Sequence, residues 1–287
     1  MAVTNFVPDL WSAKLLVALR KFQVAGSLVN RDYEGEIKRQ GDSVKITSVA
    51  DVTIGTYTAH TDITVEDIDD ATRSLLIDQA RYFAVELDDL ERAQAVNGGA
   101  VLAQAVENAA YQLKDTVDSF LLATINTTLQ GGANDLGTLA VHTPATASVY
   151  DALVAIAVKL DENNVPDDGR FVVLKPAAHG LLLKDARFIS AGDDAGAATR
   201  ANGRIGSAAG LEVYKSNNLP AVTDALATGG VVIGGYRGAT TFAEQIVSVE
   251  GARMEKRFAD MVKGLHVYGA KVVRPTALVV AELDATA

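Results

Sequence analysis

The sequence predicts an α+β fold, and three observations lead to this class. Segments with apolar residues at helical spacing alternate irregularly with segments that show the two-residue alternation of strands. These segments do not follow the strand–helix–strand order of a parallel α/β protein. The chain has 287 residues and is 48% hydrophobic but only 6% aromatic. It can therefore bury a core of its own, built mainly from small aliphatic side chains.

The first predicted helix, residues 10–22, is short and amphipathic, with Asp9 as a suitable N-cap. The charged segment 30–46, NRDYEGEIKRQGDSVKI, follows it. We interpret both as contact surfaces for a neighbouring subunit, and a solvated surface loop is the alternative for the charged segment. The predicted interface residues are Trp11, Leu15, Arg31, Asp32, Glu34, Glu36, Lys38 and Arg39.

Residues 44–87 predict a long ribbon of two or three strands with a polar tip. β-Branched and aromatic residues alternate in VKITSV, DVTIGTYT and RSLLIDQARYFAVEL, and the acidic segment EDIDDATR separates the strands. Because a two-stranded ribbon alone is marginally stable in water, we expect this ribbon to lie on another surface.

Residues 100–129 predict a long helix that serves as a structural spine. Its apolar stripe includes Leu102, Leu113 and Leu121, and Gly131 and Gly132 end it. At 1.5 Å per residue the helix would extend ~45 Å. Just before this region, Asp88 and Asp89 are expected to open a helical segment, where the backbone dipole favours carboxylates.

The second half of the chain predicts mixed elements. Ser148 and Asp151 form the capping box of a helix, and Pro176 opens another helix after the buried strand RFVVL. The Gly- and Ala-rich segment 190–210 is expected to be a loop. Strands are predicted for LEVYK, for GGVVIGGY, and on both sides of Pro275.

Charge and composition exclude several classes of protein. The net charge of −10 argues against a protein that grips nucleic-acid phosphates. The absence of cysteine excludes disulfides and thiolate metal sites. We find no signal-peptide pattern and no apolar run long enough to span a membrane.

The motifs of the common catalytic sites are missing, and we expect neither enzymatic activity nor a cofactor. The sequence contains no phosphate-binding loop, no dinucleotide-binding glycine pattern and no hydrolase elbow. The four histidines are scattered: His60, His142, His179 and His266. Paired carboxylates could hold a divalent cation, but solvated turns and helix starts are favoured for these pairs. The pairs are Asp69–Asp70, Asp88–Asp89, Asp167–Asp168 and Asp193–Asp194.

The order of several segments resembles the major capsid (coat) proteins of tailed bacteriophages, particularly the podovirus-type branch. These segments are FVPDLWSAKLL, NRDYEGEIKRQGDSVKI, LLIDQARYFAVELDDLERAQA, AGLEVYKSNNLP and GLHVYGAKVVRP. The resemblance covers almost the whole chain, and it rests on segment order and spacing because no single motif is diagnostic.

The resemblance implies a structural subunit of an icosahedral shell, built from hexamers and pentamers, that encloses double-stranded DNA without tight binding. It implies an N-terminal arm (1–34), an extended β-hairpin loop (35–80), a peripheral domain with the spine helix (81–139 and 229–287) and an axial domain (140–228). We expect a separate scaffolding protein and a portal as partners, and a location in the virion after assembly in the host cytoplasm. The alternatives are a cellular nanocompartment shell of the same fold and a metal-dependent enzyme that uses the acidic pairs.

Overall fold

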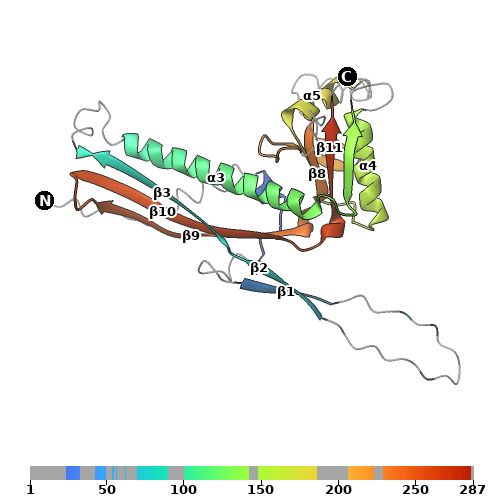
Figure 1. Ribbon diagram of the computed structural model, residues 1–287, viewed down its shortest axis with the longest axis horizontal. Coiled ribbons are helices and arrows are strands. Elements are labelled where there is room, and N and C mark those ends of the chain that lie inside the picture. Colours follow the sequence, from blue (N-terminus) through green and yellow to red (C-terminus); the bar gives the residue numbers. More distant parts are fainter. Residues whose placement is uncertain are drawn as a thin grey trace.

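The computed structural model describes residues 24–32, 43–49, 54, 56, 62, 70–89, 100–141, 148–185, 206–222 and 229–285. Within these residues the chain has a long part, in which a helix lies along a narrow sheet, and a broader sheet with its own helices at one end (Figure 1). The predicted α+β class is confirmed.

The long part is a three-stranded antiparallel sheet covered by one helix. The sheet has the order β3–β10–β9 and comprises β3 (Gln79–Asp88), β9 (Thr240–Arg253) and β10 (Ala259–Val272). The helix α3 (Ala100–Leu129) has the predicted bounds and lies along this sheet (Figure 1). Buried apolar side chains form the contact between the helix and the sheet, namely Phe83, Val106, Ala110, Leu113, Val249 and Val262. Gly131 follows the helix with φ +72°, a conformation that favours glycine.

The broader part is a six-stranded mixed sheet with the order β4–β11–β8–β5–β7–β6. Its strands are β4 (Asp135–Ala140), β5 (Arg170–Leu174), β6 (Ser207–Ala208), β7 (Leu211–Lys215), β8 (Gly230–Tyr236) and β11 (Leu278–Asp284). The helices α4 (Val149–Glu162) and α5 (Pro176–Lys184) belong to the same part (Figure 1). Every residue of β5 is buried, as the apolar run at residues 171–174 predicts for all but Arg170.

The sequence predicted the start of both helices of this part. Ser148 accepts a hydrogen bond from the backbone of Asp151, whose carboxylate accepts one from the backbone of Ser148. Pro176 is the first residue of α5. Short 3-10 helices complete the fold at Ala25–Ser27, Arg237–Ala239 and Pro275–Ala277.

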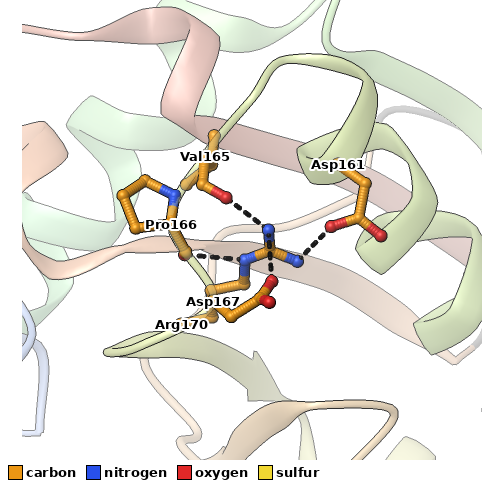
Figure 2. Close-up of polar contacts among 5 residues, drawn as sticks. All are labelled: Asp161, Val165, Pro166, Asp167 and Arg170. Carbon is orange, nitrogen blue, oxygen red and sulfur yellow. Dashed lines mark hydrogen bonds and ion pairs between the residues drawn. The ribbon is translucent and has the colours of Figure 1, made fainter.

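A buried arginine fixes the connection between α4 and β5. Arg170 lies at the start of β5 and donates to the backbone oxygens of Val165 and Pro166 (Figure 2). Its guanidinium also pairs with Asp161 at 2.7 Å and Asp167 at 2.9 Å. Because these four partners surround one planar cation, the turn after α4 is held against the first residue of the strand.

The predicted ribbon is present in part. β1 (Ser43–Val49) and β2 (Asp70–Leu76) form an antiparallel hairpin that pairs Ser43 with Leu76 and Val49 with Asp70. The single strand expected across RSLLIDQARYFAVEL is wrong, because the chain breaks at residues 77–78 and β3 joins β10 instead. Residues 70–73, expected in the polar segment between strands, lie within β2.

Asp88 is the last residue of β3, because it continues the ladder opposite Ala259, and the helical conformation expected for Asp88 and Asp89 begins at Asp89. The six-stranded sheet also crosses the predicted domain limit at residues 228–229. Its strands β8 and β11 come from the region expected in the peripheral domain, yet they pair with β5 and β4.

No helix among the described residues is long and apolar enough to cross a membrane.

Candidate assembly surfaces

The root of the β1–β2 hairpin is packed firmly on the long sheet. Leu75 and Ile77 are buried against Ala243 and Val267. The Arg73 guanidinium donates to the backbone oxygen of Val273 at 2.6 Å. The hairpin therefore leaves the body from a fixed origin.

A glycine in β10 makes this close approach possible. A Cβ atom at Gly269 would lie 2.3 Å from the backbone oxygen of Leu76 and 3.0 Å from the Cα of Ile77. Both neighbours are backbone atoms that cannot move aside as a side-chain end can. Any side chain at this position would displace the hairpin root.

Beyond its root, the hairpin runs away from the sheet on which it is anchored (Figure 1). β1 and β2 pair only with each other among the described strands. Ile54, in the segment between the two strands, is 96% exposed. The hairpin thus presents backbone and apolar surface that its own subunit leaves uncovered in the part of the chain that the structure describes.

Most of the predicted interface residues cannot be placed. Trp11, Leu15, Glu34, Glu36, Lys38 and Arg39 lie outside the described residues. Asp32 is exposed, and its backbone N–H donates to the side chain of Asn30 at 2.9 Å. Arg31 forms an ion pair with Glu244 of its own chain, so an intrachain contact accounts for part of its charge.

The segment around Arg31 continues this attachment to the body. Ala25, Leu28 and Val29 are buried in the main core, and Asn30 forms a parallel bridge with Thr241 of β9. Residues 24–31 of the predicted arm are therefore packed on their own subunit.

Glu244 is the centre of a buried polar cluster between Arg31 and His266. Its side chain is 5% exposed, and Nε2 of His266 lies 3.2 Å from its Oε2 atom. Burial raises the pKa of Glu244, but its contacts with His266 and with the charge of Arg31 oppose this effect and leave the pKa below its usual value. Arg31 also lies 5.3 Å from the ring centre of Phe242.

A second buried carboxylate, Asp118, was missed by the sequence analysis. It lies on α3, accepts a hydrogen bond from the backbone N–H of Ala25 at 2.8 Å, and accepts another from Nδ2 of Asn218 at 3.1 Å. Lys114, one turn earlier, attracts Asp118 electrostatically, while burial lowers the pKa of this lysine. The available signal was a carboxylate within the apolar stripe, between Val117 and Leu121.

The outer surface of the three-stranded sheet and its end carry paired charges. Arg253 pairs with Asp89, Arg257 lies 3.1 Å from Glu86, and Lys263 lies 3.0 Å from Glu250. Tyr82 and Phe258 are exposed in the same region. This surface combines weak, solvated ion pairs with two aromatic rings.

Two of the aspartates from the predicted acidic pairs bind arginines, and the two histidines that the structure describes are buried. Asp167 pairs with Arg170, and Asp89 pairs with Arg253. His179 is buried on α5, where burial and the charge of Lys215 lower its pKa. Among the described residues, no three His, Asp or Glu side chains are grouped so that they could hold a metal ion. Asp69, Asp193, Asp194, His60 and His142 lie outside those residues.

Comparison with known proteins decides the family. The model of the phage capsid protein family matches residues 47–281, which is more than half of the chain. The chain belongs to the phage capsid protein family. No curated protein matched this capsid protein.

Solved structures agree with the family assignment. The structure from Mycobacterium phage Che8 is 29% identical, has a TM-score of 0.73, and each chain covers 98% of the other. The capsid of cyanophage P-SCSP1u is 18% identical with a TM-score of 0.69, over 93% of this chain and 89% of that one. The mature capsid of bacteriophage PhiM1 is 17% identical with a TM-score of 0.66, over 90% and 88%.

The capsid protein is thus a structural subunit of a phage shell, and it has the tailed-phage capsid fold that the sequence predicted. The family match favours a phage capsid over the nanocompartment alternative. The family role is structural rather than enzymatic. The podovirus-type branch stays a prediction.

Proposed function

We propose that this capsid protein assembles through hexamers and pentamers into an icosahedral shell around a double-stranded DNA genome. The observation that carries the proposal is the β1–β2 hairpin, which is anchored at its root and whose two strands pair with no other strand among the described residues. A lone two-stranded hairpin is marginally stable in water. Covering it with a neighbouring subunit would bury its surface and would link adjacent copies.

We assign the parts of the subunit by their shape. The long sheet with α3 would be the peripheral domain, and the six-stranded sheet with α4 and α5 would be the axial domain near the ring centres. This division puts β8 and β11 in the axial part, since they are central strands of its sheet. The hairpin and the N-terminal segment would be the connecting elements.

The contacts between copies would be numerous and individually weak. Exposed ion pairs contribute ~0–1 kcal/mol each, so charged segments such as 30–39 would mainly set register and exclude wrong partners. Rings of five and six require heterologous contacts that close. Weak contacts would allow misplaced subunits to dissociate before a shell closes.

The remaining partners are inferred from the family resemblance and from charge. A separate scaffolding protein and a portal would take part in assembly in the host cytoplasm, and the shell would become part of the virion. The net charge of −10 favours an inner wall that does not hold the genome tightly.

Electron microscopy of the purified protein with variants of the hairpin tests the proposal. Ile54→Asp places a charge on the exposed hairpin segment, and Ile54→Leu is the matched control. We expect shells from the wild type and the control, and folded but unassembled subunits from Ile54→Asp. Normal shells from Ile54→Asp would contradict the role assigned to the hairpin.

A further inference from the structure

The segment 24–32 is held to the rest of the subunit at two points, each centred on a buried carboxylate. Near one end, the backbone N–H of Ala25 donates to Oδ1 of Asp118 on α3. Near the other end, Arg31 pairs with Glu244 on β9. The segment therefore crosses from the helix to the sheet and is fixed at both ends of the crossing.

Backbone hydrogen bonds fix the register between these two points. The N–H of Asn30 donates to the backbone oxygen of Thr240 at 2.8 Å, and the N–H of Phe242 donates to that of Asn30 at 2.9 Å. A shift of one residue would break both bonds and would also withdraw Arg31 from Glu244. The path of the segment is therefore defined residue by residue.

Buried carboxylates make this attachment specific. Asp118 is 4% exposed and the Glu244 side chain 5%, and a buried charge is costly unless hydrogen bonds and opposite charges compensate it. The segment 24–32 supplies part of that compensation to both groups. An apolar contact would also hold the segment, but it would not require the backbone to take one exact position and direction.

We infer that Asp118 and Glu244 are positioning residues for assembly, which together fix the position and direction of segment 24–32 on the subunit. We refer to the contacts of segment 24–32 with these two carboxylates as the two-point clamp. The clamp goes beyond the proposed function because it concerns how the subunit aims its own N-terminal segment. Only its assembly readout rests on the proposed use of residues 1–23 as a contact between copies.

The clamp also connects the N-terminal segment to the six-stranded sheet. Asp118 accepts hydrogen bonds from Asn218 at 3.1 Å and from Ser216 at 3.4 Å, both of which follow β7. Asn218 also donates to Asp115 at 2.7 Å. A rearrangement of the residues after β7 would therefore affect Ala25, because both are hydrogen-bonded to the Asp118 carboxylate.

Hydrogen exchange of the purified, unassembled subunit, measured by mass spectrometry, tests the clamp directly. The test variants are Asp118→Asn, Glu244→Gln and Arg31→Gln. Glu107→Gln is the control on α3, since Glu107 is exposed. Glu250→Gln is the control on β9, where Glu250 is exposed and pairs with Lys263.

We expect the test variants to exchange the amides of residues 24–32 about tenfold faster, which is the scale of one lost hydrogen bond to a charged group. Exchange in β8 and β11 should be unchanged, and both controls should match the wild type. Unchanged exchange at residues 24–32 would overturn the inference. Equal acceleration throughout the subunit would also overturn it, because that pattern indicates a purely structural role.

Assembly is the measurement that would not change if Asp118 and Glu244 only stabilised the fold. We expect subunits with a released clamp and a protected core to form fewer closed shells and more irregular particles in electron micrographs. Faster exchange at residues 24–32 together with normal shells would overturn the positioning role. If Asp118→Asn does not fold, Arg31→Gln still tests the clamp, since its site is partly exposed.

The two proposals can fail separately. A wild type that forms no particles would count against the proposed function, and the exchange comparison would still decide whether the clamp exists.

Discussion

Nε2 of His266 lies 3.2 Å from Oε2 of Glu244, and the histidine side chain is only 1% exposed. Among the described residues, this contact and the ion pair with Arg31 surround a carboxylate that has almost no access to water. The pKa of Glu244 is lowered below the ordinary value of 4.5, because His266 and Arg31 together outweigh the effect of burial. The carboxylate is therefore charged at neutral pH.

The Glu244 cluster predicts a loss of stability in acid. A carboxyl group whose folded pKa lies below its unfolded pKa stabilises the protein above the unfolded value, and this contribution is lost as pH falls through the folded value. At pH 7, Glu244→Gln should lower the free energy of unfolding by about 1–3 kcal/mol, since it removes the charged partner of Arg31 from a buried position. The difference from the wild type should shrink steadily below pH 4.5.

Denaturant unfolding of unassembled subunits, from pH 7 down to the lowest pH at which both proteins fold, measures this difference. Glu250→Gln, at an exposed position of the same strand, should change stability by less than about 1 kcal/mol. A constant difference between the wild type and Glu244→Gln at every pH would contradict the prediction.

Gly269→Ala should disturb the origin of the hairpin. The new Cβ atom would lie 2.3 Å from the backbone oxygen of Leu76, so the hairpin root or β10 must move. We expect a loss of about 1–3 kcal/mol, typical of overpacking, together with impaired assembly. Thermal unfolding and electron microscopy measure the two effects.

Gly180→Ala is the matched control for that substitution. Gly180 lies inside α5, and a Cβ atom there would meet nothing within 4 Å. Because alanine is the better helix former by about 1 kcal/mol, this variant should be as stable as the wild type or more stable. A Gly269→Ala protein that behaves like Gly180→Ala would show that the close approach at β10 is unimportant.

Arg170→Met should loosen the connection between α4 and β5. It removes the donor to the backbone oxygens of Val165 and Pro166 and the partner of Asp161. We expect a loss of about 1–3 kcal/mol, which arises chiefly from the backbone oxygens because Asp161 is exposed.

Arg237→Met provides the comparison for the buried arginine. Arg237 is about half exposed, donates to Glu212 at 2.6 Å and should contribute less than about 1 kcal/mol. Urea unfolding of both variants gives the comparison. Equal losses would mean that the burial of Arg170 does not strengthen its contacts.

The purified subunit should bind duplex DNA weakly or not at all at physiological salt. Its net charge of −10 opposes the counterion release that drives such binding. Fluorescence anisotropy with a labelled duplex, repeated at two salt concentrations, measures this. A sub-micromolar affinity that falls with added salt would contradict the prediction.

The sequence alone determined the elements whose signals are local. The bounds of α3 follow from an apolar stripe that ends at two glycines, and α4 follows from the Ser148–Asp151 capping box. β5 follows from the apolar run at residues 171–174. Each signal lies within a few residues of the element that it defines, so it can be read without knowledge of the fold.

Only the tertiary structure decided which strands pair and which charges are buried. No local pattern separates β2 from β3. The break at residues 77–78 depends on how Ile77 packs against Gly269 of β10. Asp118 and Glu244 have the same side chains as solvated carboxylates elsewhere in the sequence. Their roles arise from Ala25, Asn218, Arg31 and His266, residues distant in sequence that folding brings within hydrogen-bond or ion-pair distance.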